Sequence, residues 1–474
     1  MRTFLFYDLE TSGLHHAFDQ VLQFGAIRTN EQLEEIERHE FRIKIRPDVI
    51  PSPEALTTTK VNPELLHQGT YNEYEAIKVI HALFNTPETT SIGYNSIGFD
   101  DLMLRHAFYR NLFDPYTHGY SNKCSRADLL PVAIIYRQFA PEGIQWPVTE
   151  EGKPSMKLEL ISKLNALASG NAHDAMVDVE ATLALARKMK QNATIWSWAM
   201  GYFDKNNYNS RLEKYLEAKK LGEQLTIQWG LLVDNKLGGL NGYQAPVLYL
   251  GFTGMKQHLY LQLDRTDLEA ADQEGTLNEL NCVWRGKAGE PPFILPFDKL
   301  QSEYITEERR ALMSKNIQWI KNNPQSFEQL RQFQIDFRYA EVQNVDEDDR
   351  IYQGFWESKV KNMNLSFHQA KDWNEKYDIA GLYPNETVRT LARRILFRNE
   401  ERLSPELGAQ QMEFITERWA DEDIIDKTGR PRLTAQKALE RTEELLQEEN
   451  LADDNRQILE EYMEWLHERL ANFY

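Results

Sequence analysis

Cysteine is nearly absent: the 474 residues include only Cys124 and Cys282. Two cysteines exclude a disulfide framework and a cysteine-rich zinc module, and they suit a reducing compartment. Apolar runs of the roughly 18 residues that span a bilayer are also missing. The amino terminus has no signal-peptide pattern, because residues 1–9 already have the composition of a strand. We therefore expect a cytoplasmic protein without a membrane segment.

Positive charge is in short supply as well. Lys and Arg number 54 against 73 Asp and Glu, which gives a net charge of −19 and a pI near 5.2. This balance argues against a polycation that coats duplex DNA, although net charge does not report a local basic cleft. Hydrophobic residues make up 41% of the chain, enough for more than one core, and the length predicts about three domains.

The first block of the chain alternates strand and helix patterns. Runs rich in β-branched and aromatic residues predict strands at Thr3–Leu9, Val21–Thr29, His39–Ile45 and Thr90–Tyr94. Helical periodicity predicts helices at Tyr71–Phe84, Asp100–Leu112, Leu158–Leu167 and Asp174–Lys190. Three adjacent strands followed by strand–helix units indicate a mixed sheet with helices on its faces.

The later blocks differ from the first in character. A small β-barrel or sandwich is predicted from Gln224–Val233, Pro246–Leu250 and Gln257–Leu263, followed by helices at Glu307–Asn322 and Ser326–Val342. The acidic run Asp346–Asp349 is most simply a solvated linker. A helical bundle is predicted from Glu386–Asn399, Pro405–Ala420, Thr434–Glu449 and Asn455–Ala471.

Two carboxylates stand at the end of the first predicted strand. Asp8 and Glu10 are two residues apart, so both side chains project from one face of that strand. Neighbouring carboxylates repel each other and need a proton or a cation between them. Ligands that are all oxygen suit Mg²⁺ or Mn²⁺ better than zinc. The alternative is a polar strand end that enters a loop.

Two further segments carry acidic residues beside a turn or a histidine. Two aspartates head a predicted helix: either Asp100 or Asp101 caps it, or Asp100 serves as a third carboxylate beside the first strand. His173 and Asp178 cannot share one helix face, because five helical residues turn about 500°. We therefore place His173 on the preceding loop, where proton transfer is feasible, with Asp174 as the cap and Asp178 facing inward. The alternative is an exposed histidine and a solvated aspartate.

Taken in order, the three segments resemble a known family. Asp8-x-Glu10, then Asn95-x₃-Phe99-Asp100, then His173-x₄-Asp178 is similar to the histidine-bearing branch of the DEDD superfamily of 3′→5′ exonucleases. Further stretches look like the bacterial exodeoxyribonuclease I family, namely Gln23–Thr29, Pro47–Pro53, Met156–Glu159 and Tyr352-x-Gly354-Phe355. One departure is Ser12-Gly13, where that family commonly carries an aromatic residue.

The resemblance implies a three-part architecture. It consists of a ribonuclease-H-like mixed-sheet exonuclease domain at 1–195, a small SH3-like β-rich domain at 196–345 and a C-terminal α-helical domain at 350–474. On this expectation, residues 1–195 hold every proposed catalytic group and cut DNA distributively by themselves, while the later domains make the full chain processive.

The resemblance also implies a mechanism. Two Mg²⁺ ions, or Mn²⁺, would lie roughly 3.5–4 Å apart. Asp8, Glu10 and Asp178 would hold one ion, with Asp8 bridging to a second held by Asp100, and His173 would be the general base. The implied function is processive 3′→5′ degradation of single-stranded DNA to 5′-mononucleotides, in DNA repair and recombination.

Contacts to DNA and to partners are less defined. Residues that flank the motifs are candidates for DNA contact, with solvated surface side chains as the alternative: Thr11, Asn95, Arg105, Lys123, Arg126 and Lys157. The basic stretch Arg393–Arg398 is a candidate for contact with DNA or an acidic peptide. The resemblance implies that the acidic C-terminal tail of single-stranded DNA-binding protein is a partner, and we expect a monomer.

Two other functions remain open at this point. The first is an exoribonuclease or a proofreading-type exonuclease of the same superfamily, and the long extension beyond residue 195 argues against it. The second is a non-catalytic nucleic-acid-binding scaffold, and the intact set Asp8, Glu10, Asp100, His173 and Asp178 argues against that.

Overall fold

The computed structural model describes residues 2–170, 174–221, 225–399 and 405–471. The chain divides into two compact units. The first unit combines residues 1–126, 169–180 and 341–474, and the second combines residues 127–168 and 181–340. The three-part division at 1–195, 196–345 and 350–474 stays a prediction, but the compact units cut the chain differently. None of the helices in the described part of the chain combines the length and apolar character needed to cross a bilayer.

A five-stranded mixed sheet contains the predicted strands of the first block. Its strand order is β3-β2-β1-β4-β5, with β1 antiparallel to β2 and parallel to β4. The strands are β1 Thr3–Thr11, β2 Val21–Thr29, β3 Glu35–Arg42, β4 Thr89–Gly93 and β5 Ser125–Asp128. This is the predicted ribonuclease-H-like mixed sheet, and the predicted fold class is confirmed.

The third strand lies earlier than predicted. β3 occupies Glu35–Arg42 instead of His39–Ile45. It is an outer strand of the sheet and none of its residues is fully buried, so charged residues are tolerated along it. Apolar residues alone therefore predict a strand that begins and ends too late, near Ile45.

Helices cover the sheet within the first unit. They include α3 Glu73–Phe84, α4 Asp100–Arg110 and the start of α7 Ala175–Lys190. α7 approaches β2 closely, because a Cβ atom at Gly25 would lie 2.8 Å from the carbonyl carbon of Ala175. Only glycine allows this approach, which brings the first turn of α7 next to the central strands.

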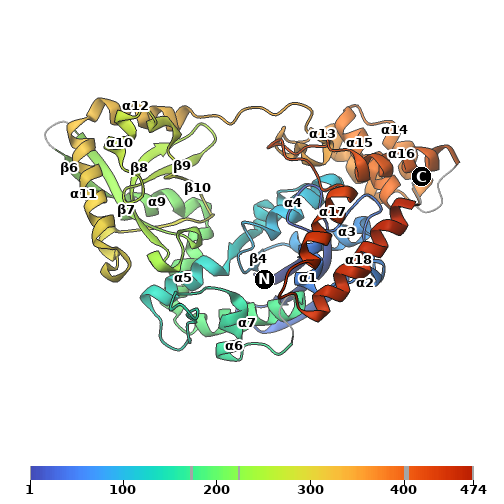
Figure 1. Cartoon of the computed structure of the whole chain (residues 1–474), viewed down its shortest axis with the longest axis horizontal. Coiled ribbons are helices and arrows are strands. Elements are labelled where there is room, and N and C mark those ends of the chain that lie inside the picture. Colours follow the sequence, from blue (N-terminus) through green and yellow to red (C-terminus); the bar gives the residue numbers. More distant parts are fainter. Residues whose placement is uncertain (1, 171–173, 222–224, 400–404, 472–474) are drawn as a thin grey trace. The chain divides into compact units, whose positions relative to one another are not determined.

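The C-terminal helices belong to the same compact unit as the mixed sheet. Their bounds are α13 Ser358–Gln369, α14 Trp373–Gly381, α15 Glu386–Asn399, α16 Pro405–Ala420, α17 Ala435–Leu446 and α18 Asp453–Ala471. α18 lies along two short N-terminal helices, α1 Pro53–Thr59 and α2 Pro63–His67 (Figure 1). α15 and α16 have the predicted bounds, whereas α13 and α14 were not predicted.

Two hydrophobic clusters join the ends of the chain. One contains Phe24 and Phe108 together with Phe367 and Leu391 of the C-terminal helices. The other contains Leu56 with Trp419 and Tyr462. The sheet region and the C-terminal helices therefore share apolar cores instead of burying separate ones.

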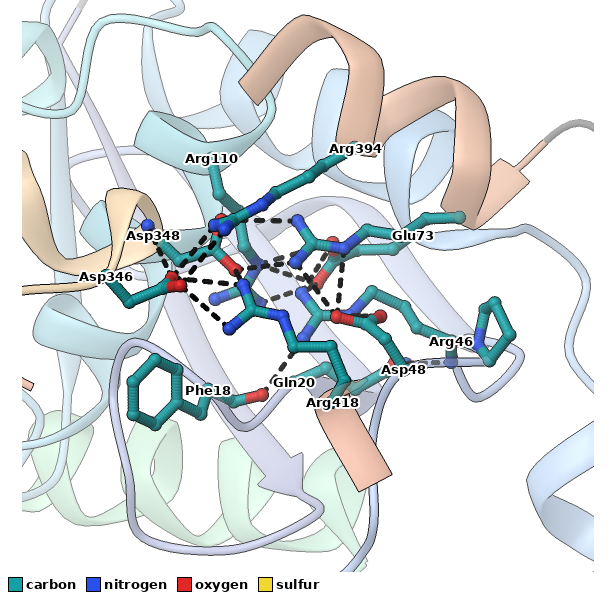
Figure 2. A network of polar contacts seen from close by, with 12 residues as sticks. Phe18, Gln20, Arg46, Asp48, Glu73, Arg110, Asp346, Asp348, Arg394 and Arg418 are labelled. Carbon is teal, nitrogen blue, oxygen red and sulfur yellow. Dashed lines mark hydrogen bonds and ion pairs between the residues drawn. The ribbon is translucent and has the colours of Figure 1, made fainter. Parts of the chain in front are cut away.

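The acidic run at 346–349 is buried or partly buried, so the prediction of a solvated linker was wrong. Asp348 has no exposed surface and Asp349 is 3% exposed. Asp346 pairs with Arg394 and with Arg418, each at 2.8 Å (Figure 2). Arg398 bridges Asp348 and Asp48. The surrounding arginines hold the pKa of Asp346 and of Asp348 below the usual range.

The same ion pairs correct the interpretation of the basic stretch Arg393–Arg398. Arg394 and Arg398 are both buried, and their guanidinium groups are occupied by the aspartates. They are therefore not available to contact DNA or an acidic peptide. Arg393, on the outer face of α15, is exposed.

We expect Arg398→Ala to lower the free energy of unfolding by about 3–5 kcal/mol, because two buried carboxylates lose a partner. Arg393→Ala is the matched control on the same helix, and it should change that free energy by less than about 0.5 kcal/mol. Denaturant unfolding followed by circular dichroism measures both values. Equal midpoints for the two variants would show that the buried ion pairs contribute nothing to stability.

The second unit contains a six-stranded antiparallel sheet, which is the β-rich region that the sequence predicts. The strand order is β10-β9-β8-β7-β11, and β6 pairs with β7. The strands are β6 Glu217–Leu221, β7 Leu225–Val233, β8 Gln244–Phe252, β9 Gln257–Gln262, β10 Val283–Lys287 and β11 Phe293–Leu295. The helices of this unit are α5 Leu129–Phe139, α6 Leu158–Asn165, α8 Ala193–Met200, α9 Tyr208–Tyr215, α10 Leu268–Gln273, α11 Glu307–Asn322 and α12 Pro324–Asp336.

Candidate active site

Three carboxylates meet where the central strand approaches α7. Asp8 and Glu10 come from β1, and Asp178 comes from the first turn of α7. Each side chain offers an oxygen atom, and these atoms all lie within 4.8 Å of one another. Glu10 is buried, while Asp8 and Asp178 are partly buried. The predicted strand face and the predicted inward helix face thus bring the three side chains together.

The electrostatics of this cluster favour a cation. Burial and the charges of Asp100, Glu10 and Asp178 raise the pKa of Asp8 well above its usual value. Burial and the charges of Asp178 and Asp100 raise the pKa of Glu10 to about 8. A nearby positive charge lowers the pKa of a carboxyl group, so a divalent cation would stabilise the ionised forms of these carboxylates.

Asp100 belongs to this cluster electrostatically and does not cap α4. The residue at the cap position is Phe99, which makes no side-chain cap hydrogen bond, and Asp100 and Asp101 lie in the first helical turn. Asp100 is 7% exposed and raises the pKa values of Asp8 and Glu10. Of the two sequence interpretations, the geometry therefore favours a further carboxylate over a helix cap.

Asp101 has a structural role that the sequence did not reveal. Its carboxylate accepts a hydrogen bond from Nε2 of His118 at 2.8 Å and pairs with Arg105 and Arg126. Arg126 is buried at this site, and the guanidinium group of Arg105 also lies over the ring of Tyr116. Neither arginine is therefore a solvated surface charge, which was the alternative, and their contact with DNA stays a prediction.

The segment that precedes α7 is partly described. His173 lies outside the described residues. Oδ1 of Asp174 accepts a hydrogen bond from the Met176 amide at 3.1 Å, and the Asp178 amide donates to the Asp174 carbonyl at 3.1 Å. Asp174 therefore caps the helix as predicted, and the cap fixes the turn that carries Asp178.

The other candidates for DNA contact differ in exposure. Thr11 is buried and donates a hydrogen bond to the Gly13 carbonyl at 2.8 Å. Asn95 is exposed in a left-handed backbone conformation, with φ 63°. Lys123 is exposed and pairs with Glu88, and Lys157 is an exposed residue of the second unit. Their contact with DNA stays a prediction.

The loop after β1 explains the Ser12-Gly13 departure. Oγ of Ser12 donates to Oδ1 of Asp19 at 2.8 Å, which closes the loop on itself. A Cβ atom at Gly13 would lie 2.4 Å from Oδ2 of Asp19. A larger residue at position 13 would therefore displace the Asp19 carboxylate.

Two buried arginines donate hydrogen bonds to the backbone of this loop. Arg46 donates to the Phe18 carbonyl at 2.9 Å, and Arg110 donates to the Ala17 carbonyl at 3.3 Å. Both arginines pair with the buried Glu73 and belong to the ion network of Figure 2. They lower the pKa of Glu73 to about 2. The network of ion pairs that includes the C-terminal helices thus extends to the loop that follows β1, the strand that carries Glu10.

Sequence comparisons identify the region that holds this site. The family model described as RNase_T, exonuclease, matches residues 5–186. Exodeoxyribonuclease I of Escherichia coli strain K12 is 43% identical over 189 residues, or 40% of each chain. Exodeoxyribonuclease I of Haemophilus influenzae is 37% identical over 217 residues, which cover 46% of this chain and 45% of the relative. The matches thus span less than half the length of these relatives.

Solved structures match the fold over almost the whole chain. Exonuclease I from Methylocaldum szegediense has a TM-score of 0.82 at 26% identity, covering 99% of this chain and 100% of that one. E. coli exonuclease I in complex with a dA16 oligonucleotide has a TM-score of 0.82 at 24% identity with the same coverage. A structure of SSB with exonuclease I and the inhibitor CFAM has a TM-score of 0.81, again at 24% identity and the same coverage. At 24% identity, the last two comparisons support the fold alone.

Proposed function

Residues 5–186 form an exonuclease domain in a chain that has the fold of exonuclease I, and from this premise we propose that the protein degrades single-stranded DNA from its 3′ end. The observation that carries the proposal is the cluster of Asp8, Glu10 and Asp178, whose oxygens lie within 4.8 Å of one another inside that domain. The relatives named exodeoxyribonuclease I, at 43% and 37% identity over the region that holds the cluster, favour DNA over RNA as the substrate.

The donor set fits a hard divalent cation. All four carboxylates offer oxygen only, which suits Mg²⁺, with Mn²⁺ as a substitute. Asp8, Glu10 and Asp178 would hold the cation, and Asp100 would assist at a second position beside Asp8. Such cations, when bound, help to activate the attacking water and stabilise the leaving 3′-oxygen.

The chain's own residues complete the chemistry. His173, two residues before α7 in the sequence, would accept the proton of the attacking water, since an unperturbed imidazole, with a pKa near 6.5, is suited to this at neutral pH. The cap at Asp174 holds the first turn of α7, which keeps Asp178 beside Asp8 and Glu10. The product is a 5′-mononucleotide released from the 3′ end.

A protein partner, an oligomeric state and a compartment are further parts of the proposal. The acidic C-terminal tail of single-stranded DNA-binding protein is the proposed protein partner, because a structure of similar fold contains SSB with exonuclease I. The proposed state is a monomer and the proposed compartment is the cytoplasm, where Cys124 and Cys282, both free and buried, would stay reduced. The proposed biological setting is DNA repair and recombination.

His173→Ala should slow cleavage by about 10²–10⁴-fold, which is the usual contribution of a general base. Raising the pH should partly restore the rate, because hydroxide needs less help. Single-turnover kinetics over a pH series measures both effects. The variant should keep the metal-induced rise in melting temperature, and loss of that rise would make His173 a ligand or a structural residue.

The substrate is tested by supplying strands of one sequence as single-stranded DNA, single-stranded RNA and blunt duplex DNA with Mg²⁺. The proposal expects rapid release of mononucleotides from the DNA single strand and much slower release from the other two. Preference for the RNA strand would favour the exoribonuclease alternative. A chain that binds the DNA strand but releases no nucleotides from any of the three would favour the non-catalytic scaffold.

A further inference from the structure

Buried arginines outnumber buried carboxylates in the ion network of the first unit. We call this network the arginine cluster, and its buried cations are Arg46, Arg110, Arg394, Arg398, Arg418 and Arg432. Its carboxylates are Asp48, Glu73, Asp346 and Asp348, whose side chains are at most 8% exposed. The partly exposed Glu347 at the edge is shared between Arg394 and the further cation Arg350. The cluster therefore contains more positive than negative charge.

Arg432 is the arginine of this cluster that has no carboxylate partner. It is 3% exposed, and its Nη2 donates to the backbone carbonyl of Asp48. None of the carboxylates in the described ranges forms an ion pair with Arg432, and its Nε and Nη1 have no hydrogen-bond partner among those residues. A guanidinium group donates hydrogen bonds and accepts none, so these two buried donors need an acceptor.

Arg418 adds another donor of the same kind. Its terminal nitrogens bind Asp346 and Asp348, whereas its Nε is buried without a partner in the described part of the chain. Burial and the charges of Arg418 and Arg46 lower the pKa of Arg432 to about 9. The cations of the cluster thus act on Arg432 as uncompensated neighbours.

The carboxylates around Arg432 are occupied by other groups. Asp48 forms ion pairs with Arg46 and Arg398. On the loop after β1, each carboxylate oxygen of Asp19 accepts a hydrogen bond from within that loop. Leaving a buried charge without a partner is strongly destabilising, so the cluster needs a further negative charge.

We propose that Arg432 and Arg418 bind a small inorganic anion the size of chloride inside the arginine cluster. One such ion accepts several N–H donors at once and supplies the missing negative charge. Neither arginine is more than 3% exposed, which excludes a nucleotide or another large anion as the ligand. The site is separate from the metal-binding carboxylates, so this inference does not depend on the proposed function.

The anion would also stabilise the loop that follows β1. The guanidinium carbon of Arg432 lies 5.3 Å from the ring centroid of Phe18, and Nη2 of Arg46 donates to the Phe18 carbonyl at 2.9 Å. Phe18 and Asp48 come from the N-terminal part of the chain, whereas Arg418 and Arg432 come from its last block. A charge that neutralises the cluster would therefore hold the two ends of the chain together.

Thermal melts of the full chain, without DNA and without Mg²⁺, test the site. Sodium chloride, sodium phosphate and sodium gluconate are compared at one ionic strength, so that screening is equal. We expect the melting temperature to be about 2 °C higher in saturating chloride than in gluconate, because a ligand of the folded state alone stabilises that state. A rise in phosphate without a rise in chloride would contradict an anion of chloride size.

Two variants separate a bound anion from a general salt effect. Arg432→Met removes the charge and the donors but keeps an apolar chain against Phe18. In gluconate it should melt at or above the wild-type temperature, because an unpaired buried charge is gone, and its rise in chloride should vanish. Arg430→Met is the matched control: the Arg430 side chain is 72% exposed on the same turn, so this variant should keep the rise in chloride. An equal rise in all three proteins would overturn the proposal.

A second measurement uses the wild-type chain, so it does not depend on the folding of any variant. Crystals grown in sodium bromide should give an anomalous diffraction peak within hydrogen-bonding reach of Nε of Arg432 and Nε of Arg418. Ordered water at that position, without an anomalous peak, would satisfy the donors without supplying charge and would show that the proposal is wrong.

Discussion

Asp8→Asn should abolish measurable cleavage of single-stranded DNA, with a loss of roughly 10³-fold or more. A bound metal contributes several kcal/mol to such reactions, and each 1.36 kcal/mol is a factor of ten in rate. The same substitution should raise the melting temperature in EDTA, because Asp8 is repelled by Asp100, Glu10 and Asp178. It should also remove most of the stabilisation that Mg²⁺ gives to the wild type. Single-turnover rates and thermal melts with and without Mg²⁺ measure all three effects.

The matched control is Glu180→Gln. Glu180 lies on α7, two residues beyond Asp178, but its side chain is 37% exposed and pairs with Arg38. Its substitution should leave both the rate and the Mg²⁺ effect on melting unchanged. An Asp8→Asn protein that cuts DNA at the wild-type rate, or whose melting temperature falls in EDTA, would contradict the role given to the cluster.

A fragment of residues 1–195 should fail to fold, despite containing every proposed catalytic group. Truncation removes Phe367, Leu391, Trp419 and Tyr462 from the two shared cores. It also removes Arg398, the partner of the buried Asp48. Breaking one buried pair costs about 3–5 kcal/mol, and a whole domain is stable by only about 5–15 kcal/mol.

Circular dichroism and size-exclusion chromatography of the fragment test this expectation. The sequence alone predicted instead that residues 1–195 cut DNA distributively by themselves. That prediction arose because the sequence of the first block does not show that its cores are shared with the C-terminal helices. The control is the full chain with Glu328→Gln, which keeps both cores and should fold normally, since Glu328 pairs with Arg331 at the surface of the second unit. A folded, monomeric 1–195 that cuts DNA would show that the C-terminal helices are dispensable for the catalytic unit.

Local patterns were sufficient for the carboxylates that carry the proposal. The two-residue spacing of Asp8 and Glu10 follows from strand geometry alone, and β1 carries both side chains as predicted. The inward position of Asp178 follows from its place in the first turn after the cap at Asp174. β2 and α15 have the predicted bounds because their apolar positions are regular.

Those local patterns could not predict ion pairs between residues that are far apart in the sequence. The buried state of Asp346 and Asp348 depends on Arg394, Arg398 and Arg418, which follow 46 to 72 residues later, and on no local signal. A run of like charges is usually solvated, so the composition of this segment wrongly predicted an exposed linker. β3 was misplaced because an outer strand tolerates polar residues, and the ion pairs of Asp101 were not predicted because its partners, His118 and Arg126, are remote in sequence.

The most direct test of the central claim follows a single DNA strand labelled at either end. With Mg²⁺, the 5′-labelled strand should shorten through a ladder of products, while the 3′-labelled strand should release its label as a mononucleotide at once. EDTA should stop both reactions. A ladder from the 3′-labelled strand, internal cuts, or equal cleavage in EDTA would contradict a metal-dependent 3′→5′ exonuclease.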